Sequence, residues 1–209
     1  MRYAIIAAGE GSRLATEGID MPKPLVEVNG EPLIDRLIRI FADNNAEEIV
    51  VICNDKTTLV SSHLMKIQED GLNGRRIPLR FVVKSTPSSM HSLYEISRYL
   101  EGAPYCLTTV DTIFREKEFS NYIMALNDAM ETYSADGLMA VTDYIDDEKP
   151  LYVDTDGTMT IIGRGESRMR NFQRAMVADG LHLEAFPFSK ILDIDHKSDI
   201  GKAEEFLRV

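Results

Sequence analysis

The chain has 209 residues, of which 44% are hydrophobic, and its formal net charge at pH 7 is −11. This length and hydrophobic content predict one α/β domain with a full core and exclude a disordered chain. The negative charge argues against nucleic acid or anionic lipid as a partner, so any phosphate site has to be a local cationic pocket.

The amino-terminal apolar run ends at Gly9 after a single Arg, and nowhere do about eighteen apolar residues follow one another. We therefore expect a cytoplasmic protein with no signal peptide and no membrane partner, and we leave a homo-oligomer open. Cys53 and Cys106 each lie in a strand-like run, which favours buried, reduced thiols over a disulfide or metal ligands.

Short apolar runs alternate with amphipathic segments in the first two thirds of the chain, which predicts a mostly parallel sheet covered by helices. Strands are expected at residues 3–7, 48–53, 79–83, 105–110 and 137–142. Helices are expected at 32–41, 57–69 and 89–100, and a longer one carries an apolar stripe from Phe119 to Tyr133.

The alternation of short apolar runs with amphipathic segments ends near residue 143. Residues 143–165 predict a small lobe within the single domain 1–209. Its core is a β-hairpin with strands at 151–153 and 159–162 and a turn at 154–157. A polar helix near 166–179, a strand at 190–195 and a final helix capped by Ser198 complete the prediction.

A glycine loop, Gly9-Glu10-Gly11-Ser12-Arg13, follows the first strand, and Pro22-Lys23-Pro24 comes ten residues after Arg13. Its glycines let the main chain approach a ligand and point N–H groups at phosphate oxygens, while Arg13 and Lys23 supply positive charge. The loop lacks the Gly-Lys-Ser/Thr ending of a Walker loop, and the third small position of a dinucleotide fingerprint falls on Leu14. The combination indicates a nucleoside triphosphate (NTP) site.

Together with Val-x-Val-Asn-Gly-x-Pro-Leu-Ile, which ends at Ile34, these motifs resemble the nucleotidyltransferase superfamily, including sugar-1-phosphate nucleotidylyltransferases and phosphocholine cytidylyltransferases. The resemblance implies a Rossmann-like three-layer sandwich of the nucleotide-diphospho-sugar transferase type, with the lobe at 143–165 on the acceptor side. It implies catalytic roles for Arg13 and Lys23. The nucleotide contacts that it implies are Ala7, Ala8, Gly9, Gly11, Ser12, Ser88 and Ser92.

The resemblance also implies Mg²⁺ as cofactor, held by Asp111 and by an acidic strand that contains Asp193 and Asp195. Magnesium is typically held by one or two carboxylates plus substrate phosphates, so two aspartates suffice. Period-two alternation places Asp193 and Asp195 on one face of their strand. We prefer Asp195 because it lies nearer the carboxyl end, and the choice between the two stays open.

The acceptor half is shorter than in the family, because Ile162-Gly163-Arg164-Gly165 passes quickly into Ser167-Arg168 where a further strand and helix are usual. Lys190 is a candidate contact for the acceptor phosphate, against the simpler interpretation of an exposed lysine. The acidic residues of the 143–148 loop and the arginines between 164 and 174 are interpreted as solvated faces.

The predicted reaction is magnesium-dependent transfer of a nucleotidyl group from an NTP to a phosphorylated small molecule, a sugar 1-phosphate or a phosphocholine-like acceptor, with release of pyrophosphate. Alternatives are a molybdenum-cofactor-type guanylyltransferase, a noncatalytic nucleotide-binding regulator, a glycosyltransferase and a dehydrogenase. Lys23 argues against the glycosyltransferase. The base, the acceptor and the activity of the shortened half stay open.

Overall fold

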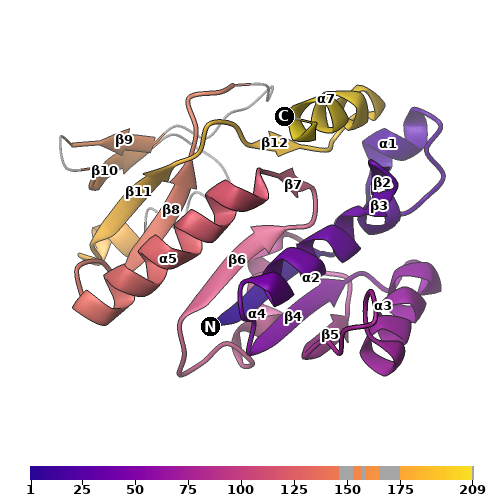
Figure 1. Cartoon of the computed structure of the whole chain (residues 1–209), viewed down its shortest axis with the longest axis horizontal. Helices are drawn as coiled ribbons and strands as arrows, with labels where there is room; N and C mark the ends of the chain where they lie inside the picture. Colours follow the sequence, from indigo (N-terminus) through magenta and orange to yellow (C-terminus); the bar gives the residue numbers. More distant parts are fainter. Residues whose placement is uncertain (146–152, 157–158, 165–174, 209) are drawn as a thin grey trace. The chain divides into compact units, whose positions relative to one another are not determined.

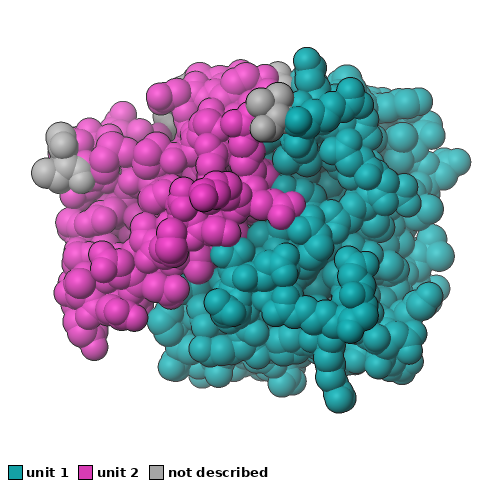
Figure 2. All heavy atoms as spheres, viewed as in Figure 1, with its two compact units in different colours: residues 1–113, 193–209 teal, residues 114–192 magenta. Residues whose placement is uncertain are grey.

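The structure is a computed structural model that describes residues 1–145, 153–156, 159–164 and 175–208. It divides into two compact units, which Figure 2 colours separately. Unit 1 comprises Met1–Ile113 and Asp193–Val209, and unit 2 comprises Phe114–Leu192. Whether both units make up one domain over residues 1–209, as expected from the sequence, stays a prediction.

Unit 1 contains a four-stranded parallel sheet with the order β5-β4-β1-β6 (Figure 1). Its strands are β1 (Arg2–Ala7), β4 (Glu48–Cys53), β5 (Leu79–Val83) and β6 (Tyr105–Thr109). β1 and β4 are almost continuously apolar and buried, as expected of central parallel strands that are covered on both faces. The predicted α/β fold with a parallel central sheet is confirmed.

Helices connect these strands and cover both faces of the sheet. They are α2 (Leu33–Asp43), α3 (Thr58–Asp70) and α4 (Ser89–Ser97). The chain moves outward from β1 to β4 and β5 and then returns to β6 on the other side of β1. Because such crossovers are right-handed, α2 and α3 lie on one face and α4 lies on the other. α2 buries its apolar stripe against the sheet, where Phe41 stacks on Tyr3 with ring centroids 4.5 Å apart.

Shorter elements complete unit 1. They are α1 (Ser12–Thr16), a 3₁₀ turn (Lys23–Leu25), the antiparallel pair β2 (Glu27–Val28) and β3 (Glu31–Pro32), β7 (Thr112–Ile113) and α7 (Lys197–Leu207). β12 (Leu192–Asp193) lies at the boundary between the units. Among the described residues, no helix has the length and apolar content that crossing a membrane requires.

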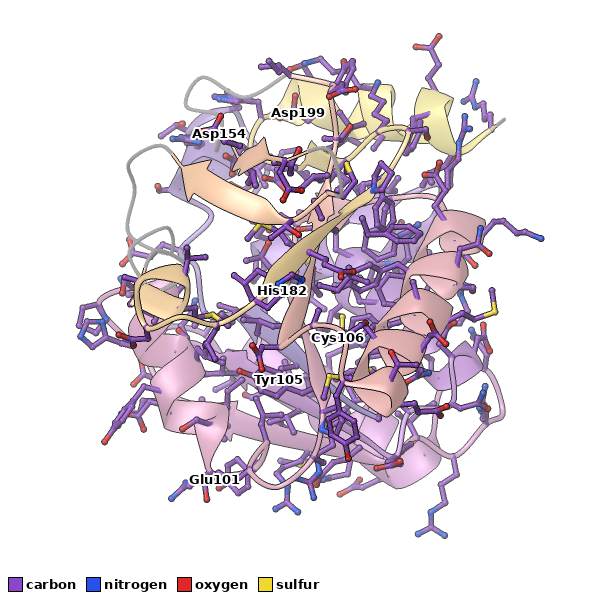
Figure 3. The ribbon with its side chains drawn as sticks, turned by 90° about the vertical axis from the view of Figure 1, so that its left-hand side faces the viewer. Glu101, Tyr105, Cys106, Asp154, His182 and Asp199 are labelled. Atoms are coloured by element: carbon purple, nitrogen blue, oxygen red, sulfur yellow. The ribbon has the colours of Figure 1, made fainter. Side chains whose placement is uncertain are left out.

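Unit 2 contains α5 (Glu116–Thr132) and a parallel pair of strands, β8 (Gly137–Val141) and β11 (Leu183–Pro187). His182, labelled in Figure 3, aligns this pair, because its N–H donates to Asp136 Oδ2 and its carbonyl accepts from Asp136 N, each at 2.8 Å. The core of the unit is an aromatic cluster of Phe114, Phe119, Tyr122, Phe186 and Phe188.

The predicted hairpin is present but shifted along the chain. Its strands are β9 (Val153–Thr155) and β10 (Ile161–Arg164), which pair antiparallel. Residues 154 and 155, predicted in the turn, therefore lie in a strand, and residues 151 and 152 lie outside the described part. The helix predicted near 166–179 is described only in part: residues 166–174 lie outside the described residues, and residues 175–178 are helical.

Other details also differ from the sequence prediction. β11 was not predicted. Tyr133, predicted to extend the apolar stripe of α5, is 91% exposed because α5 ends at Thr132 and Tyr133 has φ of 55°. The strand expected at 190–195 is reduced to β12. The cap of the last helix is His196 rather than Ser198: its N–H donates to Asp199 Oδ2 at 2.7 Å, and its carbonyl accepts from Asp199 N at 3.0 Å.

Candidate functional site

The predicted site residues of unit 1 gather where β1, β4 and β6 end. Ala7 ends β1, Asn54 follows β4, and Asp111 comes two residues after β6. Val110 N donates to Ile6 O at 3.0 Å, which keeps the β1 and β6 ends together just before Asp111. The direction of the chain across the sheet reverses between β1 and β6, which is where open α/β sheets bind ligands.

The structure gives different reasons for glycine at positions 9 and 11 of the loop. Gly11 has φ of +62°, and a Cβ on it would lie 3.1 Å from the Cβ of Lys23, so the chain itself requires glycine there. A Cβ on Gly9 would meet no atom within 4 Å. Asn54 holds this part of the loop, because its Nδ2 donates to Gly9 O at 3.1 Å. Open space beside Gly9 is what the close approach of a ligand needs.

Four of the predicted residues meet in one charge cluster. Lys23 Nζ lies 2.5 Å from Asp111 Oδ2 and 2.7 Å from Asp195 Oδ1. Arg13 Nη1 lies 2.7 Å from Asp195 Oδ2. The Lys23 side chain is 10% exposed and that of Arg13 is 57% exposed, so the cluster reaches from the protein interior to solvent. Ile194 N donates to Asp111 O at 3.0 Å and brings the segment with Asp195 to the end of β6.

The pKa values of the cluster follow from these contacts. Burial acts to lower the pKa of Lys23, but the carboxylates of Asp111 and Asp195 outweigh it and the pKa is raised. Burial acts to raise the pKa of Asp195, but Lys23 and Arg13 outweigh it and the pKa is lowered. The ammonium and the carboxylate are therefore both charged at neutral pH.

Asp193, the alternative metal ligand, differs from Asp195. Although the residue reaches solvent, the protein around it desolvates the carboxyl, and the charges of Asp111 and Asp195 add to this effect. Together they raise the pKa of Asp193 to about 7. The two carboxyl groups thus differ in the direction of their pKa shifts, and the choice of Asp195 over Asp193 as metal ligand stays a prediction.

The cluster has the donors that magnesium prefers. Asp111 Oδ1 is buried and has no hydrogen-bond partner among the described residues, which is costly for a carboxylate oxygen. Asp111 and Asp195 both contact Lys23, and their carboxylate oxygens are the hard donors that magnesium takes. The described residues contain no group of three or more His, Cys, Asp or Glu side chains placed to hold a metal ion.

The remaining predicted residues are distributed around the loop and beyond it. Ser12 begins α1 and is exposed. Ser88 precedes α4, and its hydroxyl lies 2.9 Å from His91 Nδ1. Ser92 is 1% exposed, and its hydroxyl lies 2.6 Å from that of Thr86, so this hydroxyl already has a partner inside the protein. Lys190 belongs to unit 2, where its Nζ lies 4.0 Å from the ring centroid of Tyr144.

Sequence reasoning missed two residues of this region, Asn54 and Glu17. Asn54 directly follows the carboxyl end of a buried strand, which is the same signal that identified Asp111. Glu17 contacts His196 and Lys197, 179 and 180 residues further along the chain, and no spacing in the sequence reveals such a contact.

Comparison with known proteins places the chain among nucleotidyltransferases. The model of the MobA-like NTP transferase domain family matches residues 3–160. The chain is 27% identical over 115 residues to the UTP–glucose-1-phosphate uridylyltransferase AglF of Haloferax volcanii, covering 54% of this chain and 44% of the relative. It is 29% identical over 63 residues to the glucose-1-phosphate cytidylyltransferase of Salmonella typhimurium, covering 30% and 24%. The matches thus span less than half of these relatives.

Solved structures share the fold at low identity. HddC from Yersinia pseudotuberculosis, complexed with GMP-PN, has a TM-score of 0.72 at 18% identity, with 98% of each chain covered. The inositol-1-phosphate CTP transferase from T. maritima has a TM-score of 0.69 at 18% identity, with 99% of this chain and 98% of that chain covered. These findings confirm the nucleotidyltransferase resemblance, and because the family match spans more than half of the 209 residues, the chain belongs to the MobA-like NTP transferase domain family.

Proposed function

We propose that the protein transfers a nucleotidyl group from an NTP to a phosphorylated small molecule and releases pyrophosphate. The observation that carries this proposal is the meeting of Arg13 and Lys23 with Asp111 and Asp195 beside the glycine loop. Such a cluster combines cations for phosphate oxygens with carboxylates for a divalent metal. The names of the Haloferax and Salmonella relatives support a sugar 1-phosphate as acceptor. A phosphocholine-like acceptor is the second possibility.

In this reaction an oxygen of the acceptor phosphate attacks the α-phosphorus of the NTP. The bond from that phosphorus to the α,β-bridging oxygen breaks, and pyrophosphate leaves with its electron pair. The protein supplies no nucleophile and forms no covalent intermediate, so its contribution is to position two anions and to neutralise their charge.

We assign these tasks to the residues of the cluster. Lys23 and Arg13 exchange contacts with Asp195 for contacts with phosphate oxygens when the NTP binds, and Gly9 and Gly11 let the main chain lie against the triphosphate. Asp111 and Asp195 would hold a magnesium ion. When bound, this ion supplies positive charge to the phosphates of both substrates and relieves their repulsion.

Pyrophosphate release tests the proposal. The protein is mixed with each of the four ribonucleoside triphosphates and dTTP, magnesium, and a panel of sugar 1-phosphates and phosphocholine. We expect release that needs one NTP, one acceptor and the metal together. Lys23→Ala and Asp111→Ala each lower kcat/KM about 100-fold or more, as the loss of a charge that stabilises the transition state does.

The matched control is Lys66→Ala, which removes an exposed lysine of α3 and keeps the wild-type rate. Nucleotide binding without pyrophosphate release under any condition would favour the noncatalytic regulator. Pyrophosphate release from GTP that does not depend on any of the sugar phosphates or on phosphocholine would favour the guanylyltransferase alternative. Full activity in Lys23→Ala or Asp111→Ala would contradict the mechanism.

A further inference from the structure

Two carboxylates hold the main chain around Asp195. Asp199, in the first turn of α7 (Figure 3), accepts from His196 N at 2.7 Å and from Asp195 N at 3.2 Å through Oδ2. Glu17 accepts from the next main-chain group, Lys197 N, at 2.6 Å through Oε2. Three consecutive N–H groups, of residues 195, 196 and 197, therefore have carboxylate acceptors, and these bonds hold the backbone from which the Asp195 side chain projects.

Glu17 makes a second contact with the same segment. Its Oε1 lies 2.6 Å from His196 Nδ1, and since an ionised carboxylate only accepts hydrogen bonds, this ring nitrogen is the donor. The contact lowers the pKa of Glu17 and raises that of His196, so the pair favours opposite charges. Each carboxylate oxygen of Glu17 thus has its own N–H donor, one from a ring and one from the main chain.

Glu17 is also the C-cap of α1, the helix that carries Arg13. It directly follows α1, and its N–H donates to Arg13 O at 3.2 Å. α1 therefore contacts the Asp195 segment at two points, through Arg13 on the carboxylate of Asp195 and through Glu17 on Lys197 N and the His196 ring. These two contacts fix the orientation of α1 relative to the Asp195 segment, which a single contact through the flexible Arg13 side chain would leave free.

We propose that Glu17 is a positioning residue for the metal-binding carboxylate, because it ties the end of α1 to the start of α7 and thereby holds Asp195 against Lys23 and Arg13. This inference rests on the proposed function. Glu17 touches no reacting group, and its contribution is the geometry of the segment next to the metal. Residues that orient a metal ligand typically change metal affinity or activity by about 10- to 100-fold when they are replaced.

The test compares Glu17→Gln with the wild type. Glutamine has the size of glutamate but is uncharged and presents an NH₂ donor where one oxygen was. The ionic contact with a His196 Nδ1–H is therefore lost, and only a weaker neutral contact, in which the other imidazole tautomer accepts from the NH₂ group, can replace it. We expect the magnesium concentration for half-maximal pyrophosphate release to rise about tenfold, with KM for the NTP at saturating magnesium unchanged within about twofold and much of kcat recovered there. Glu69→Gln, which changes an exposed glutamate of α3, is the matched control for the lost charge.

A binding measurement gives a readout that does not depend on turnover. Mn²⁺ binding to the wild type and both variants, with a nonhydrolysable NTP analogue present, is followed by electron paramagnetic resonance. We expect Glu17→Gln to bind Mn²⁺ about tenfold more weakly than Glu69→Gln. Melting temperatures are recorded alongside, and loss of metal affinity in a variant that melts like Glu69→Gln supports positioning over simple destabilisation.

The outcomes separate the two proposals. An active wild type whose metal dependence and Mn²⁺ affinity survive Glu17→Gln overturns the positioning role and leaves the proposed function intact. A wild type that binds Mn²⁺ with the analogue but turns over no substrate overturns the proposed transfer reaction, while the Mn²⁺ affinities still decide about Glu17. A wild type that neither turns over nor binds Mn²⁺ overturns both.

Discussion

Gly9 and Gly11 look equivalent in the sequence, yet only one of them is required by the folded chain. Gly11 is held in the left-handed region beside Lys23, whereas a side chain on Gly9 would meet only open space. If the loop lies against a nucleotide, the reason for glycine at position 9 is the ligand itself. The two positions therefore separate the demands of folding from those of binding.

We predict that alanine at position 11 affects mainly stability and that alanine at position 9 affects mainly nucleotide binding. Gly11→Ala destabilises the protein by about 1–2 kcal/mol, since an L-residue in the left-handed region is strained and Lys23 has to give way. Gly9→Ala changes the unfolding free energy by less than about 0.5 kcal/mol but weakens the binding of an NTP analogue about tenfold or more. Urea unfolding and titration calorimetry measure the two quantities. If Gly9→Ala bound the NTP analogue as tightly as the wild type, the loop would not be part of the nucleotide site.

The residues that sequence reasoning selected are those whose signal is local. Arg13, Lys23 and Asp111 stand at fixed distances from glycines, prolines or a strand end, and the structure brings them together with Asp195. Ser92 has the same kind of local signal, but its hydroxyl is buried against Thr86, which only the packing of α4 reveals. Glu17 depends on a partner 179 residues away, so no local pattern could identify it.

At the scale of elements, α3 offers a clean test of how its first turn is stabilised. Thr57 has an extended backbone and its Oγ1 accepts from Leu59 N at 3.2 Å, which satisfies one of the free N–H groups of the helix start. Thr58, the next residue, is exposed and lies inside the helix. The same side chain thus has two different roles at adjacent positions.

We predict that Thr57→Ala lowers the unfolding free energy by about 1 kcal/mol, because the N–H of Leu59 loses its acceptor. Thr58→Ala changes it by less than about 0.5 kcal/mol, since alanine is the better helix former and no cap is lost. Urea unfolding curves of the two variants, compared with the wild type, give both values. Equal losses would mean that the cap does not stabilise α3 measurably.

The elements that were mispredicted share a physical cause, the dominance of tertiary contacts over local preference. In β11, Leu183 and Ala185 pack with Met139 and Val141 in a hydrophobic cluster, while Phe186 joins the aromatic cluster. Apolar side chains on both faces hide the period-two pattern, and Leu, Glu and Ala favour helix locally. At α7, Ser198 is the better cap by propensity, but the contacts of His196 with Glu17 and Asp199 start the helix earlier. The long buried strands β1 and β4 carried signals strong enough to be predicted.

At the scale of the whole molecule, a chain with a net charge of −11 has to bind substrates that are themselves strongly negative. The local cations Arg13 and Lys23 are already engaged by Asp111 and Asp195, so the cluster has little positive charge to offer before a metal arrives. Conversely, Lys23 neutralises the carboxylates that a metal needs. Metal and nucleotide are therefore expected to bind together, each supplying the charge that the other requires.

This coupling predicts a specific pattern of thermal stabilisation. Magnesium and the NTP together at about 100 times their dissociation constant stabilise the protein by about 2.7 kcal/mol, a rise in melting temperature of roughly 5–10 °C for a chain of this size. Magnesium alone, or the NTP with a chelator, gives much smaller shifts. In Lys23→Met, which removes the ammonium group that Asp111 and Asp195 share, magnesium alone becomes stabilising. Thermal-shift curves of both proteins, recorded without ligand and under the three ligand conditions, measure this. If magnesium alone shifted the wild type as much as it shifts Lys23→Met, Lys23 would not compete with the metal.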